Sequence, residues 1–208
     1  MGTISGEKRV KIIWGKIISA SEKEICLVCR VVNKIDNDFT QVILDWETNS
    51  VLVTKKVAKI FTDGEIAFAI AHEIAHFEHE DNKRTKVVVD KYSDIVNSMV
   101  NKVDKKLKES GAGFFKRFVT SVLVGTTGMA SAFVNMRAES REYETEADLR
   151  AIETMKKVGY NPSEAKNALA KLLGGYFSKH TIWESIASTH PELKSRIEII
   201  EKKIKEIN

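Results

Sequence analysis

The pair of histidines His72 and His76 constrains this chain more than any other feature, because it lies in an apolar stretch with helical periodicity. The segment reads His72-Glu73-Ile74-Ala75-His76. Apolar residues recur around it at Ile66, Ala67, Ile70, Ala71, Ile74, Ala75 and Phe77. Residues four apart on a helix lie one above the other, so both imidazoles can reach one small metal ion. The pattern predicts a buried helix over about 64–81, with Asp63 as its N-cap.

Glu73 follows the first histidine directly, where its carboxylate can reach a water molecule bound to the same metal. Two histidines four apart with a glutamate between them are typical of the zinc-binding helix of metalloproteases. The structural alternative is a core helix whose histidines are simply hydrogen-bonded. A buried glutamate beside two histidines needs a polar partner under either interpretation.

A second, acidic segment offers the third protein ligand that a catalytic zinc site requires. Glu144 and Asp148 are four residues apart within Glu142-Tyr143-Glu144-Thr145-Glu146-Ala147-Asp148, on a helix predicted over about 138–158. One carboxylate can bind the metal while the other holds a ligand imidazole by its free N–H. The alternative is a solvated acidic helix face. The presence of both motifs in one chain favours the metal site.

Four segments together resemble the gluzincin metallopeptidases of the HtpX-like and CAAX prenyl endopeptidase group. They cover residues 40–54, 72–76, 140–148 and 188–197. The resemblance implies an α+β, predominantly helical, zincin-like domain with a small β-hairpin or sheet against the histidine helix. It implies one Zn²⁺ per chain, held by His72, His76 and Glu144. Asp148 matches the family's aspartate that lies behind the ligands.

The resemblance also assigns roles to the remaining site residues. Glu73 matches the general base that activates a zinc-bound water. His190, in the segment before Pro191, matches a histidine that stabilises the oxyanion or fills the open metal position in a resting state. The alternative is a surface-loop histidine near the start of the last helix. Arg196 matches the arginine that closes this segment and is placed with Asp148 around the ligands.

The predicted function is a zinc-dependent endopeptidase that hydrolyses peptide bonds in extended or unfolded protein segments. Its partner is therefore a peptide or protein substrate, which we expect to pair as an added strand with an edge strand near Val51–Thr54. The alternative is a latent enzyme, or a non-catalytic zinc-binding chaperone or adaptor with the same fold. The intact Glu73 argues against a pure scaffold, because a scaffold needs no base. The sequence does not define the oligomeric state.

Composition is that of an ordinary globular protein, with 43% hydrophobic and 30% charged residues among 208. This length fits one domain over 1–208, with a core over about 40–200 and an N-terminal extension over 1–39. The net charge of +4 is spread through lysine-rich helices, so we expect no nucleic-acid partner. The N-terminal segment lacks the pattern of a secretory signal, which predicts a cytoplasmic protein, with membrane association as the alternative.

Residues 118–136 carry no charge over 19 positions, a length close to the ~20 residues of a membrane span. Eleven of these residues are apolar, and the others are glycine, threonine, serine and asparagine. A single crossing would separate the histidine helix from Glu144 on opposite sides of a bilayer. The sequence therefore favours a buried or groove-lining helix, with peripheral membrane contact as the alternative.

The remaining segments follow local patterns. Ser21 and Glu24 form a capping-box pattern that predicts a helix over 21–35, in which Cys26 and Cys29 would be small core residues. Residues 8–20 fit either a strand or a helix. Further strands are predicted over 41–46 and 51–54, joined by a turn, and further helices over 55–61, 83–110, 161–173 and 191–207.

Overall fold

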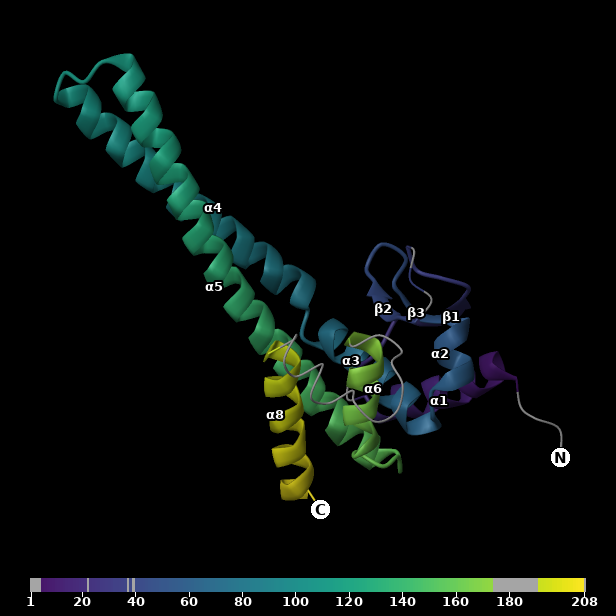
Figure 1. Ribbon diagram of the computed structural model, residues 1–208. Coiled ribbons are helices and arrows are strands. Elements are labelled where there is room, and N and C mark those ends of the chain that lie inside the picture. The colour runs from purple at the N-terminus through teal and green to yellow at the C-terminus, as the bar shows by residue number, and fades with distance from the viewer. Residues whose placement is uncertain (1–4, 22, 37, 39, 174–190, 208) are drawn as a thin grey trace. The chain divides into compact units, whose positions relative to one another are not determined.

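The computed structural model describes residues 5–207 except 22, 37, 39 and 174–190 (Figure 1). Contacts within the chain define two compact units. The sheet unit comprises Met1–Glu80 and Glu144–Asn208, and the hairpin unit comprises Asp81–Tyr143. The fold is α+β and mostly helical with a small sheet, as predicted.

The sheet has three strands, β1 (Val28–Val32), β2 (Val42–Asp45) and β3 (Ser50–Thr54), in the order β1-β3-β2. β2 and β3 form the predicted antiparallel hairpin, and β1 pairs with β3 in parallel. Because β3 has a neighbour on both sides, the expectation that Val51–Thr54 serves as an edge strand is wrong. Among the described strands, β1 and β2 are the edges.

The predicted helix over 21–35 is also wrong, because residues 28–32 are the strand β1. Ser21 is instead the C-cap of α1 (Gly6–Ala20), so the ambiguous segment 8–20 is helical. Three valines in β1 suit a pleated strand, and pairing with β3 outweighs the local capping pattern. Cys29 is half-buried, but Cys26 is exposed, so Cys26 is not a core residue.

Helix α3 (Asp63–Glu78) carries the two histidines and follows α2 (Lys55–Ile60). Its N-cap is Thr62 and not the predicted Asp63. The Thr62 hydroxyl accepts from the Glu65 backbone N–H, and the Glu65 carboxylate accepts from the Thr62 N–H. Both bonds satisfy donors that a helix start leaves open. The buried Glu65 also pairs with Lys171 of α6 (Glu164–Leu173) at 2.6 Å.

The core of the sheet unit surrounds α3. Helices α1 and α6 and strand β2 pack against it. Its fully buried side chains include Ile66, Phe68 and Ile70 of α3, Ile13 and Ile17 of α1, Val51 and Val53 of β3, Ile152 and Met155 of α5 (Phe114–Lys157), and Ile200 of α8 (Pro191–Ile207). The histidines are therefore presented by a rigid, enclosed helix, which holds their side chains in a fixed geometry.

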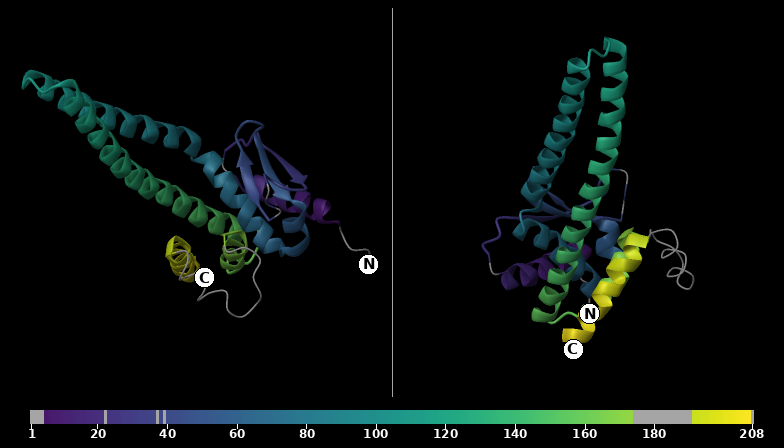
Figure 2. Two further views of the ribbon diagram at one scale, coloured as in Figure 1. Left: turned by 45° about the horizontal axis from the view of Figure 1, so that its top comes forward. Right: turned by 90° about the vertical axis from the view of Figure 1, so that its left-hand side faces the viewer.

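The hairpin unit consists of α4 (Asp81–Glu109) and the part of α5 up to Tyr143, which run side by side (Figure 2). Gly111 ends α4 with a φ of 74°, a left-handed conformation that glycine adopts without strain. Arg117 donates two hydrogen bonds of 2.9 and 2.8 Å to Asp104, and the Tyr92 hydroxyl bonds Glu139 at 3.0 Å. These pairs fix the antiparallel register of the two helices.

The uncharged segment 118–136 is helical and was predicted to be buried or to line a groove. Met129, Ala130 and Ala132 do line a groove, but the outer side of the segment is not buried. Phe118, Leu123 and Met129 are 57%, 62% and 65% exposed. The segment and the predicted helix over 138–158 belong to one continuous helix, α5. No helix in the described ranges combines the length and apolarity that crossing a membrane requires.

Candidate metal centre

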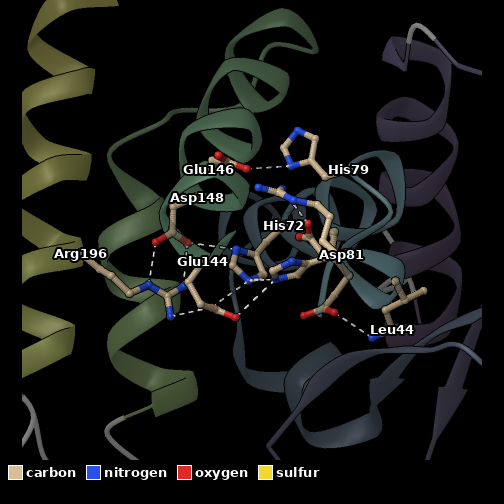
Figure 3. Close-up of polar contacts among 11 residues, drawn as sticks. Leu44, His72, His79, Asp81, Glu144, Glu146, Asp148 and Arg196 are labelled. Atoms are coloured by element: carbon tan, nitrogen blue, oxygen red, sulfur yellow. Dashed lines mark hydrogen bonds and ion pairs between the residues drawn. The ribbon is translucent and has the colours of Figure 1, made fainter. Parts of the chain in front are cut away.

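Helix α3 and the C-terminal part of α5 bring three candidate metal-ligand side chains to one point (Figure 3). The Nε2 atoms of His72 and His76 face each other at 3.0 Å. Glu144 places one carboxylate oxygen 3.5 Å from His72 Nε2 and the other 3.5 Å from His76 Nε2. Among the described residues these three form a group whose ligand atoms all lie within 4.8 Å of one another.

This donor set fits a catalytic zinc ion. Ligands arranged as a tetrahedron about 2.0–2.1 Å from zinc lie roughly 3.3 Å apart, close to the separations seen between His72, His76 and Glu144. Two imidazoles and one carboxylate leave a fourth position for water or substrate, which is the ligand set of one class of zinc peptidases. The residues present could therefore hold the metal that the sequence predicts.

Asp148 and Arg196 lie directly behind the ligands (Figure 3). Nδ1 of His72 is 3.0 Å from an Asp148 oxygen, a distance that favours the proton on Nδ1 and leaves Nε2 free for metal. Arg196 of α8 donates from Nε and Nη2 to the two oxygens of Asp148, and its Nη1 lies 2.8 Å from Glu144. One guanidinium thus orients both carboxylates.

The electrostatics of the centre favour a positive charge between the carboxylates. Burial lowers the pKa of His72, but hydrogen bonds to Asp148 and Glu144 outweigh burial and raise this pKa to about 10. Burial raises the pKa of the Glu144 carboxyl, but the two histidines and Arg196 hold it far below its usual range. A divalent ion that displaces the His72 proton would also place positive charge between the carboxylates.

Glu73 lies on α3 beside the ligands and points towards strand β2. The backbone N–H of Leu44 donates to its carboxylate at 2.8 Å. Burial raises the pKa of Glu73, while the neighbouring histidines and the Leu44 N–H lower it. A carboxyl group with a raised pKa can take up and return a proton near neutral pH. The arrangement is chemically suited to a general base.

The structure brings together six of the seven predicted site residues, namely His72, Glu73, His76, Glu144, Asp148 and Arg196. His190 lies outside the described residues. The two other acidic residues of the segment are not part of the ligand group, and Glu146 instead lies 3.9 Å from Nδ1 of His79. The catalytic and metal-binding roles themselves stay predictions.

Two contacts that sequence reasoning missed connect β2 to α3. One is the hydrogen bond from the Leu44 N–H, a backbone group that no side-chain pattern reveals. The other joins Trp46, directly after β2, to Phe77, directly after His76, with ring centroids 6.0 Å apart and planes inclined by 26°. Trp46 and Phe77 lie within the predicted strand over 41–46 and the predicted helix over 64–81, and this placement was the available signal. Together these contacts hold an edge strand alongside the site.

The family model of peptidase family M48 matches residues 32–204, which include every residue of this centre. The chain belongs to peptidase family M48. It is therefore a metallopeptidase, in agreement with the predicted class. Assignment of this M48 peptidase to the HtpX-like or the CAAX prenyl endopeptidase group stays a prediction. The comparison with curated proteins found no match.

Proposed function

We propose that this M48 peptidase is a zinc-dependent endopeptidase in which His72, His76 and Glu144 hold the metal. The convergence of their three ligand atoms within 4.8 Å carries the proposal. Zinc bound there would polarise the substrate carbonyl and lower the pKa of a water molecule to about 7. Asp148 keeps the His72 proton on Nδ1, and Arg196 keeps both acidic side chains in place.

Glu73 is the proposed general base. Its carboxylate accepts a proton from the attacking water and returns it to the nitrogen of the leaving amine. The Leu44 N–H stabilises the ionised form that begins this cycle, and burial stabilises the protonated form that follows. A non-catalytic scaffold has no need of a carboxylate in this position, so the arrangement favours an enzyme.

The proposed substrate is an extended or unfolded segment that pairs with β2. In the described sheet β2 is an edge strand. The Leu44 N–H on this edge already donates to Glu73, so an added strand would pair with the other backbone groups that β2 turns away from β3. Backbone groups on such an edge can pair with an added strand, which selects an extended chain rather than a folded one. The stacked Trp46 and Phe77 keep the end of this strand against α3.

Metal analysis and casein turnover, measured side by side for the wild type and Glu73→Gln, test the proposal. We expect the variant to keep one zinc ion per chain and to lose at least about 100-fold in turnover, since only the base is removed. The amide oxygen of glutamine can still accept from the Leu44 N–H, so the fold is preserved.

Glu142→Gln is the matched control, because it makes the same chemical change at an exposed position of the acidic segment. It should resemble the wild type in both measurements. Full turnover in Glu73→Gln, or a wild-type protein that is active without bound metal, would contradict the proposed mechanism.

A further inference from the structure

The outer side of α5 in the hairpin unit is an exposed face without charge. Its large apolar side chains are Phe118, Val119, Val122, Leu123 and Met129, which are 47–65% exposed. The opposite side of the helix packs on α4, where a Cβ atom added at Gly128 would lie 3.4 Å from the Val96 side chain. These apolar side chains are therefore open to solvent, and Met129 lies where the exposed face meets α4. We call the side formed by residues 118, 119, 122, 123, 126, 127, 129 and 130 the outer face.

The threonines on the outer face do not call for a polar partner. The hydroxyls of Thr126 and Thr127 each donate to the backbone carbonyl of Leu123, at 2.9 Å. A hydroxyl that is satisfied within its own helix costs much less to remove from water than an unpaired one. The outer face can therefore leave water almost as readily as an apolar surface.

Positive charge is concentrated at the end of the hairpin where the outer face begins. Residues 102–117, which we call the basic tip, contain six lysines and arginines and two acidic residues, Asp104 and Glu109. Their net charge of +4 equals that of the whole chain, so the rest of the sequence is balanced. Arg117 is paired with Asp104, and the exposed Lys105 lies 3.9 Å from Glu109. Lys106 and Lys116 are also exposed.

The apolar surface continues from the outer face into a groove of about 650 Å³ between the two helices. Met129 belongs to both, and Val89 and Val96 of α4 line the other side of the groove. None of the lining residues is charged. The hairpin unit thus offers room for apolar groups beside its exposed apolar side chains.

We propose that the outer face and the basic tip form a docking surface for an anionic lipid bilayer. Apolar side chains on a helix enter the boundary between headgroups and acyl chains, and adjacent lysines attract anionic headgroups. The positive charge of the basic tip favours a lipid surface over a second copy of the chain as the occupant. A second copy of the chain would bring an equal positive tip, whereas an anionic lipid surface complements it.

Co-sedimentation of the full-length, zinc-loaded protein with two kinds of vesicle tests this docking surface. We expect at least tenfold tighter binding to vesicles containing phosphatidylglycerol than to vesicles of phosphatidylcholine alone, and weaker binding as salt rises. Leu123→Glu should lower binding to the anionic vesicles at least tenfold, because it places a negative charge in the outer face. Lys105→Glu combined with Lys106→Glu should also lower it.

Val87→Glu is the matched control. Val87 is 66% exposed on α4. It lies near the end of the hairpin opposite to the basic tip, because its neighbours Arg84 and Tyr92 contact Tyr143 and Glu139 of α5. This variant should bind anionic vesicles as the wild type does. Equal binding to both vesicle types, or unchanged binding by Leu123→Glu, would overturn the proposal. A wild-type dimer in solution that Leu123→Glu dissociates, without any vesicle binding, would show that a second copy covers the face.

Discussion

The guanidinium of Arg196 joins the Asp148 carboxylate through two hydrogen bonds of 2.7 and 2.8 Å. Asp148 in turn faces Nδ1 of the metal-ligand candidate His72, and the same guanidinium contacts Glu144. Arg196 lies on α8 and both carboxylates lie on α5, so one side chain connects the C-terminal helix to the metal centre. A lysine cannot reproduce this forked geometry.

Arg196→Lys should therefore weaken zinc binding by about 10- to 100-fold, the range seen when a group that orients metal ligands is changed. Competition against a chelator measures this affinity without reference to activity. Arg150→Lys is the control, because Arg150 pairs at 3.4 Å with Glu78, which is not part of the ligand group. An equal loss of affinity in both variants would show that Arg196 has no specific role at the centre.

The acidic segment of α5 gives a second prediction. Glu144→Ala should lose bound zinc, because it removes one of the three proposed ligands. Glu142→Ala and Glu146→Ala should retain it, since neither residue belongs to the ligand group. Zinc content after dialysis distinguishes the three variants. Comparable metal loss in Glu146→Ala would mean that the ligand carboxylate has been misassigned.

The site was more predictable than the fold around it, because its signals are local. The spacing of His72 and His76 and of Glu144 and Asp148 depends only on the helical repeat. The burial of α3 follows from an apolar run that includes Ile66 and Ile70. Resemblance then contributed Arg196, whose partner on α5 is 48 positions away and could not be inferred from spacing.

The errors arose where distant pairing decided the structure. Val28–Val32 becomes a strand only because β3, about twenty residues later, offers a parallel edge. Missing β1 led directly to the wrong edge strand, since the hairpin alone leaves both of its strands open. The capping pattern at Ser21 and Glu24 predicted a helix, but the residues that would have formed it include the strand β1. The exposure of Leu123 was also hidden, because apolar composition does not reveal which side of a helix has a neighbour.

Zinc uptake should depend on pH with a defined sign. The pKa of His72 in the metal-free site is raised to about 10, so this imidazole carries a second proton and a positive charge throughout the neutral range. Zinc must displace that proton, and its apparent affinity should rise with pH by up to about tenfold per unit below pH 10. Calorimetry in buffers of different ionisation enthalpy measures the protons released. Zinc uptake without proton release at pH 7 would contradict the assignment of His72 as a zinc ligand.

The hydrogen bond from the Leu44 N–H to Glu73 gives the last prediction. This bond lowers the pKa of Glu73 by favouring its ionised form, against the effect of burial. Leu44→Pro removes the N–H. The strand should tolerate proline, because this N–H is turned away from β3 and β2 is an edge strand among those described. The pKa of Glu73 should then rise, and the acidic limb of the pH–rate profile should move to higher pH.

Leu44→Ala is the matched control, since it also shortens the buried Leu44 side chain but keeps the N–H. Both variants should retain zinc, because neither touches a ligand. The alanine variant should lose some stability without a shift of the acidic limb, whereas the proline variant should show the shift. If both variants shift the limb equally, packing at Leu44 governs the base rather than its N–H. If neither does, the backbone of β2 does not tune Glu73, and the strand's remaining role would be to pair with substrate.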